Sequence, residues 1–229
     1  MFLQILIASL VGSVFALVGG VLLLAKENFA KRISLVLVSF AVGTLLGAVF
    51  FDLLPEALEG NDSQNIFIFV ILGLLVLFLF EKALKWYHCH DQEICDVHAF
   101  SSTVLFGDAI HNFIDGIVIA LSFSLGLEVG IATTIAVFFH EVPQEIGDFG
   151  VLLHAGYTKI KVFLYNFLTA VTTPVGAILG YVVLPYVEGF LPQMIAFAAG
   201  SFIYIAVSDL MPELRHKTSG EPNPSGGDS

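Results

Sequence analysis

Nine polar side chains that are able to bind a cation lie in two neighbouring apolar segments of the chain. Four of them, in the first segment, stand at positions i, i+3, i+4 and i+7 and share one helix face. In the second segment one pair is spaced i, i+4, and three acids form an adjacent stripe. The nine are Asp108, His111, Asn112 and Asp115, then His140, Glu141, Gln144, Glu145 and Asp148. Such ligands suit zinc, iron or manganese, and neither segment contains a thiolate for copper(I).

These polar clusters are costly at membrane depth, and the cost points to a bound cation. A charge near the centre of a membrane helix costs about 2.5–3.5 kcal/mol on insertion scales. The five acids, left unpaired, would oppose folding by on the order of 10 kcal/mol. Bound cations or a hydrated path would offset this. The alternative is a structural network between two helices, but such networks normally use one or two polar groups.

The stretch 140–144 reads H-E-V-P-Q and invites comparison with the H-E-x-x-H motif of zinc proteases. Its fifth position is Gln144 rather than histidine, and Pro143 interrupts the helix, so a protease is disfavoured. Pro143 lacks an N–H, frees the carbonyl of Phe139 and predicts a kink that opens space between helices. A membrane-embedded metal-dependent hydrolase stays as the alternative function. A proton or monovalent-cation pathway is a third reading.

The elements that position these residues are membrane helices. Hydrophobic residues make up 57% of the 229 residues and charged residues only 13%, with a mean hydropathy of +0.90. A soluble domain carries about 25% charged residues, so the solvent must be lipid. We predict an all-α integral membrane protein whose transmembrane domain spans residues 1–217, followed by a disordered tail at 218–229. Seven helices are expected near 2–25, 31–54, 65–86, 99–125, 129–155, 160–184 and 192–213.

The basic residues predict the orientation in the membrane. All nine lie at alternate junctions between the apolar segments. The positive-inside rule then places the N-terminus outside and the C-terminal tail in the cytoplasm. We expect a multi-pass protein of the plasma (or inner) membrane.

The chain contains an internal repeat. The motif F-A-V-G at 40–43 leads to D-L-L-P-E at 52–56, and 157 residues later F-A-A-G leads to D-L-M-P-E at 209–213. The two segments run in opposite directions through the membrane, so this is an inverted repeat, the usual sign of a secondary transporter. The same offset predicts a further helix starting near residue 222, where the chain instead has a polar tail. By the pattern of the repeat, one helix is therefore missing.

The two polar segments resemble the ZIP (Zrt/Irt-like) family of divalent metal transporters. The family's fourth helix carries H-N-x-x-[DE]-G, matched at 111–116. Its fifth carries H-E-x-P-H-E-x-G-D, matched at 140–148 except at Gln144. The resemblance covers all seven segments, whereas the family has eight helices. The sequence is therefore a truncated member or a seven-helix variant.

The resemblance implies a two-metal site between helices four and five and no enzymatic activity. His111, Asp115, His140 and Gln144 would hold one metal; Asn112, Asp115, Glu141 and Gln144 would surround the second, with Asp115 as the bridge. Glu145 would be a ligand, a supporting group or part of the exit path, whereas Asp108 and Asp148 would be supporting groups or part of the transport path. Glutamine in place of the family histidine weakens the site or shifts it toward manganese or iron(II).

The remaining expectations concern cargo, partners and outlying polar residues. The transported ion would be Zn²⁺, or Fe²⁺, Mn²⁺ or Cd²⁺, carried into the cytoplasm without any cofactor. The partners would be metal ions, lipid and a second copy in a homodimer, and no nucleic acid. Asp52 and Asp209 either serve the transport path or cap helix ends. The loop that begins His88-Cys89-His90 is either a cytoplasmic metal site or solvated.

Overall fold

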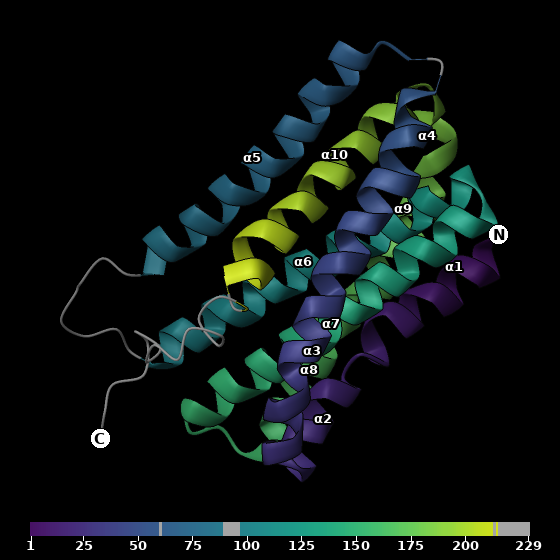
Figure 1. Ribbon diagram of the computed structural model, residues 1–229. Helices are drawn as coiled ribbons and strands as arrows, with labels where there is room; N and C mark the ends of the chain where they lie inside the picture. Colours follow the sequence, from purple (N-terminus) through teal and green to yellow (C-terminus); the bar gives the residue numbers. More distant parts are fainter. Residues whose placement is uncertain (60, 89–96, 213, 215–229) are drawn as a thin grey trace.

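In the computed structural model of this chain, residues 1–59, 61–88, 97–212 and 214 are described, and every regular element in these ranges is a helix (Figure 1). The all-α prediction is thereby confirmed. The elements are α1 (Phe2–Ser9), η1 (Leu10–Val14), α2 (Val18–Ala25), α3 (Glu27–Gly47), η2 (Ala48–Leu53), α4 (Leu54–Leu58), α5 (Ser63–His88), α6 (Val97–Leu125), α7 (Leu127–His154), α8 (Lys159–Ala170), α9 (Thr172–Val187), η3 (Glu188–Phe190), α10 (Leu191–Tyr204) and η4 (Ile205–Leu210). The elements η1, η2 and η4 are π-helical, and η3 is a 3₁₀ turn.

Six helical stretches of the described chain are long and apolar enough to cross a membrane. They are Phe2–Ala25, Leu35–Leu58, Ser63–Ala83, Val104–Leu125, Lys159–Val187 and Leu191–Ser208. These correspond to six of the seven predicted segments. The remaining one, α7, has 28 residues and would extend about 42 Å, but it carries four acids. Its membrane crossing, and hence the total of seven, stays a prediction.

Several of the predicted helices contain breaks that the apolar pattern does not reveal. The first segment changes from α1 through the π-helical η1 to α2, and the sixth is divided into α8 and α9 at Val171. By contrast, α7 continues through Pro143 without interruption. A proline in a helix removes one backbone hydrogen bond, and the rest of this long helix accommodates that loss.

The internal repeat reappears in the geometry of the backbone. The π-helical stretches η2 and η4 each have six residues and begin at Ala48 and Ile205, which are 157 positions apart. A further pair with this offset is in direct contact: the Ser13 hydroxyl lies 2.9 Å from the carbonyl oxygen of Ala170. One pair of equivalent positions is thus in contact, and another pair of equivalent stretches shares the same π-helical irregularity.

Close helix packing fixes the position of α6, which carries the first polar cluster. A side chain at Gly116 of α6 would overlap the backbone carbonyl of Thr173 in α9, and one at Gly176 of α9 would overlap that of Phe113. Glycine at both positions lets the two backbones come into direct contact, as small residues do between membrane helices. On one side of the bundle α5 lies along α10 (Figure 1).

Candidate metal centre

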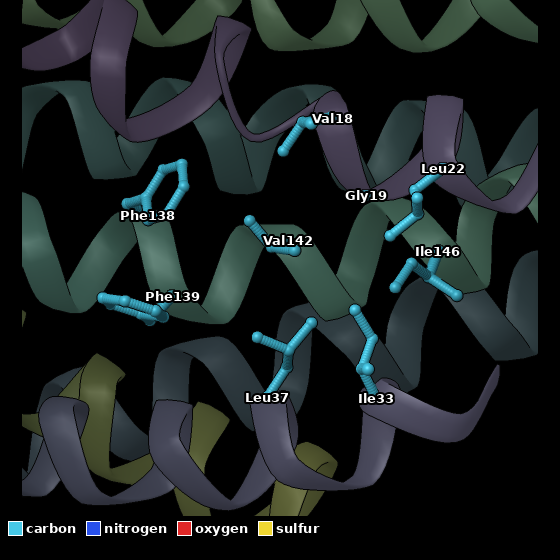
Figure 2. A pocket seen from close by; sticks show the side chains of 9 residues that line it. All are labelled: Val18, Gly19, Leu22, Ile33, Leu37, Phe138, Phe139, Val142 and Ile146. Carbon is cyan, nitrogen blue, oxygen red and sulfur yellow. The ribbon is translucent and has the colours of Figure 1, made fainter. Parts of the chain in front are cut away.

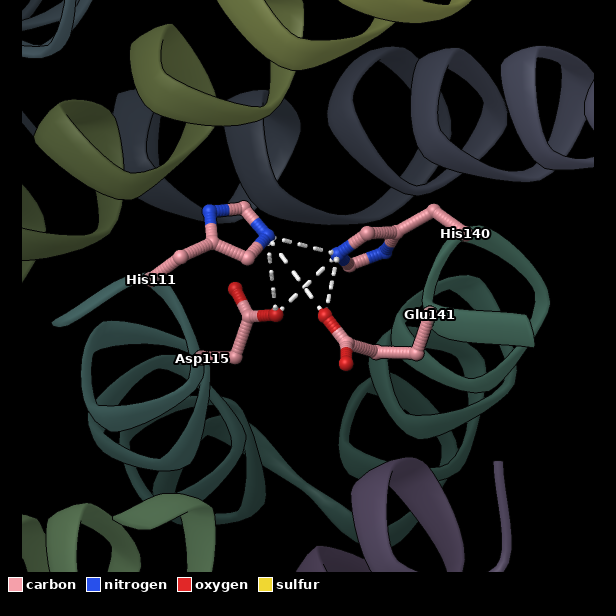
Figure 3. A group of neighbouring side chains, drawn as sticks. All are labelled: His111, Asp115, His140 and Glu141. Atoms are coloured by element: carbon pink, nitrogen blue, oxygen red, sulfur yellow. Dashed lines mark hydrogen bonds and ion pairs between the residues drawn. The ribbon is translucent and has the colours of Figure 1, made fainter. Parts of the chain in front are cut away.

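Two imidazoles and two carboxylates converge between α6 and α7 (Figure 3). His140 Nε2 lies 3.1 Å from Asp115 Oδ2 and 3.4 Å from Glu141 Oε1. His111 Nε2 lies 3.5 Å from Asp115 Oδ2, 3.6 Å from Glu141 Oε1 and 3.1 Å from His140 Nε2. We refer to His111, Asp115, His140 and Glu141 as the four-residue site.

These separations match the edges of a zinc coordination tetrahedron. Ligand atoms at about 2.0–2.2 Å from a tetrahedral Zn²⁺ lie about 3.3–3.6 Å from one another. The five distances in the four-residue site range from 3.1 to 3.6 Å. The four atoms therefore stand where a single ion could contact all of them after small side-chain shifts.

The four-residue site is buried, and its donor atoms are available. The exposed fraction is 0% for His140 and Glu141 and 1% for Asp115, whereas the His111 side chain is 16% exposed. Asp115 Oδ2 and both carboxylate oxygens of Glu141 accept no hydrogen bond. His140 Nδ1 lies 3.1 Å from the carbonyl oxygen of Ala136. When Nδ1 carries the proton and donates it to that carbonyl, Nε2 presents its lone pair to the ion.

The two predicted amide ligands, Asn112 and Gln144, are hydrogen-bonded to a different partner. Asn112 Nδ2 donates to Asp108 Oδ1 at 2.9 Å, and Gln144 Nε2 donates to the same oxygen at 2.7 Å. Asn112 Oδ1 accepts from the hydroxyls of Ser13 at 2.6 Å and Thr173 at 2.7 Å. Hydroxyl donors on one side and a carboxylate on the other determine the orientation of this amide. Neither amide is among the four converging ligands in this arrangement, although the Asn112 amide also interacts with the Glu141 carboxylate.

Sequence reasoning missed Ser13 and Thr173, which orient Asn112 from two other helices. Both are fully buried, Ser13 in η1 and Thr173 in α9. Isolated hydroxyl residues are common in membrane helices, where they bond their own backbone or bridge helices. The only available signal was their location in otherwise apolar segments, which does not identify a partner.

Three of the predicted polar residues, Asp108 of α6 and Glu145 and Asp148 of α7, are not among the four converging ligands. Glu145 is 1% exposed and Asp108 is 5% exposed, while Asp148 is partly exposed. Glu145 interacts electrostatically with both of the other carboxylates. Glu145, predicted as a metal ligand, is therefore not one of the four converging groups, although its carboxylate also interacts electrostatically with Glu141.

The outlying predicted residues can be placed only in part. Asp52 is in η2 and is partly buried. Asp209 belongs to the backbone of η4, and its side chain is outside the description. The backbone of His88 ends α5, whereas Cys89, His90 and the tail at 218–229 lie outside the described residues.

An apolar cavity of about 210 Å³ lies between α2, α3 and α7 (Figure 2). Its wall from α7 consists of Phe138, Phe139, Val142 and Ile146, which flank Pro143. The predicted free space beside this proline is therefore present. Its lining offers no side-chain ligand, so it is not a second metal site.

The helices and the four-residue site together define a multi-pass membrane protein in which side chains that could hold a metal ion meet between two helices. The family model described as ZIP zinc transporter matches residues 2–99 and 87–225. The chain therefore belongs to the ZIP zinc transporter family, as the two motifs predicted.

Curated relatives carry names that agree with this family. Zinc transporter ZIP10 of Homo sapiens is 40% identical over 144 residues, which cover 58% of this chain and 17% of that protein. Zinc transporter foi of Drosophila melanogaster is 41% identical over 120 residues, 52% of this chain and 17% of that protein. Zinc transporter ZIP13 of Pongo abelii is 32% identical over 195 residues, 78% of this chain and 58% of that protein. The chain thus spans less than two thirds of the length of each.

Proposed function

We propose that this protein transports divalent transition-metal cations, zinc first among them, across a membrane into the cytoplasm. The observation that carries the proposal is the set of ligand separations in the four-residue site, which fits a tetrahedral zinc ion. Membership of the ZIP family and the names of the relatives, which are called zinc transporters, support the same conclusion.

The ligand chemistry favours zinc over harder ions at the four-residue site. Two imidazole nitrogens and two carboxylate oxygens are a zinc set, whereas manganese prefers oxygen ligands. Iron(II), manganese and cadmium are secondary cargoes in this proposal. Because Gln144 is hydrogen-bonded to Asp108, the ligand that the family histidine would supply comes instead from Glu141.

Transport is a better reading than metal-dependent hydrolysis. A catalytic zinc keeps one position open for water and takes three protein ligands. The four-residue site offers four protein ligand atoms within 4.8 Å of one another. A shell completed by the protein leaves no position for the reacting water, so we propose no enzymatic activity.

The proposal includes a second metal position, bridged by Asp115 and completed by Asn112, Glu141 and Gln144. Reaching it would require both amides to leave Asp108 and turn their oxygens toward the ion. We further propose a homodimer in the plasma membrane, with the N-terminus outside. Asp52 would serve the outer side of the path and Asp209 the inner side.

Uptake of radioactive zinc, iron(II) and manganese into proteoliposomes tests the function. Wild-type protein should show saturable zinc uptake, and His111→Ala with Glu141→Ala should abolish it. Glu128→Gln with Glu59→Gln is the control, since both acids are exposed. A well-folded wild-type protein that binds zinc but moves none would refute the transport proposal.

A further inference from the structure

The apolar cavity between α2, α3 and α7 reaches the surface of the bundle and is lined only by apolar residues. Val18, one of the lining residues, is 55% exposed, whereas Val142 and Ile146 are buried. All nine lining residues, labelled in Figure 2, lack a polar side chain. Apolar cavities of about 150 Å³ stay dry and accept small hydrocarbon molecules. A cavity of about 210 Å³ with this lining therefore suits hydrocarbon rather than water.

The hydrocarbon next to this cavity is that of the membrane. Val18 lies in the candidate span Phe2–Ala25 and Leu37 in the candidate span Leu35–Leu58. Between apolar surfaces in a bilayer, van der Waals packing drives association, because lipid tails are as apolar as the side chains. An empty cavity forfeits those contacts on its whole lining. An acyl chain that enters from the bilayer restores them without leaving its apolar surroundings.

The chain next to the cavity is basic. Lys26 is exposed and follows α2 directly, and its backbone N–H donates to the carbonyl oxygen of Leu22, a lining residue, at 2.7 Å. On α3, Lys31 and Arg32 directly precede Ile33, which is also a lining residue. Three basic residues thus stand within about one helical turn of a lining residue along the chain.

A further pair of cations stands on α8, which contacts both α2 and α7 (Figure 1). Lys159 and Lys161, in the first turn of α8, are exposed. The sequence has no acid at 154–165, and Glu27 is the only acid at 26–32. Basic residues at a membrane surface attract anionic lipid head groups. A lipid bound beside α2 would therefore be selected for a negatively charged head group.

We propose that the cavity binds one acyl chain of a phospholipid whose anionic head group is attracted by Lys26 and the neighbouring basic residues. Phe139 and Val142 line the cavity, whereas His140 and Glu141, which stand between them on α7, belong to the four-residue site. The bound chain thus supports the helix turn that carries two of the four candidate metal ligands. This inference requires the membrane but not transport.

Native mass spectrometry of the purified full chain in detergent tests the head-group preference. Phosphatidylglycerol and phosphatidylcholine with identical acyl chains are added as the anionic and the neutral probe. Wild-type protein should retain one lipid and bind phosphatidylglycerol more tightly. Lys26→Gln should lower the phosphatidylglycerol affinity about fivefold, the contribution of one basic residue at an anionic surface. Lys82→Gln is the control, because Lys82 is an exposed lysine of α5, which packs along α10.

Blocking the cavity tests the position of the acyl chain. Val18→Trp places a large ring at the opening and should remove the retained lipid of either kind. Val21→Trp makes the same change one turn farther along α2, at an exposed residue that does not line the cavity, and should leave lipid retention unchanged. Leu37→Trp repeats the block from α3, so the test does not depend on the folding of one variant.

Three results would overturn the inference. The first is unchanged lipid retention in both Val18→Trp and Leu37→Trp. The second is a well-folded wild-type protein that retains no lipid, which would mean that the cavity is empty or covered by another helix. The third is equal affinity for the two lipids in wild type and in Lys26→Gln, which would refute the anionic head group. Lipid retention is measured without any ion, so a protein that moves no zinc still tests this site.

Discussion

Replacing His140 with glutamine should lower the zinc affinity of the protein by at least about 100-fold. His140 is completely buried and its Nε2 lies within 3.1–3.4 Å of three other ligand atoms. Its imidazole nitrogen is therefore central to the four-residue site. Groups that merely support a ligand contribute 10–100-fold to metal affinity, so losing the ligand itself should cost no less. A 100-fold loss equals about 2.7 kcal/mol of binding free energy.

Competition with a zinc chelator, on protein in detergent at neutral pH, measures this loss. His154→Gln is the matched control, because it makes the same change at an exposed position at the end of α7. Circular dichroism and gel filtration establish that both variants fold. Zinc affinity of His140→Gln within threefold of wild type would refute the assignment of this histidine as a ligand.

Three further predictions follow from the packing and hydrogen bonding. Thr173→Val removes a buried hydroxyl that donates to Asn112 and should lower the free energy of unfolding by about 1–3 kcal/mol, measured as a reduced thermal midpoint. Gly176→Ala forces α9 away from α6 and should cost about 1–3 kcal/mol by overpacking; an unchanged midpoint would contradict the close contact. Lowering the pH should release zinc from the four-residue site, because imidazole and carboxylate ligands bind metal only when deprotonated, and dialysis with radioactive zinc would detect this.

The sequence predicted the helical class and the shared face of the candidate ligands on α6 because both depend on local pattern. An apolar run of about 20 residues reports a membrane helix directly, and six such runs are found in the structure. The i, i+4 spacing places His111 above Asp115 on one helix face. That pair then meets His140 and Glu141 of the following helix.

What the sequence could not supply was the set of contacts that depend on helices distant in the chain. Asn112 matches a family ligand position, yet its amide is held by Ser13, Thr173 and Asp108. Ser13 and Thr173 come from η1 and α9, and no spacing rule relates them to Asn112, whereas Asp108 stands one turn before it on α6. The break at Val171 was equally hidden, because an apolar helix keeps the same composition on both sides of a break.

The π-helical stretches η2 and η4 also change which residues share a helix face in each copy of the internal repeat. A π-helical turn accommodates one residue more than an α-helical turn, and one residue corresponds to a rotation of about 100°. If residues are assigned to helix faces with a period of 3.6 residues starting from Gly43, the assignment is therefore wrong by one residue beyond Leu53. Deleting one residue from Ala48–Leu53 would restore an α-helix and turn α4 relative to α3. Because both copies of the repeat carry the stretch at the same position, the simplest history places the extra residue in the ancestral unit before duplication.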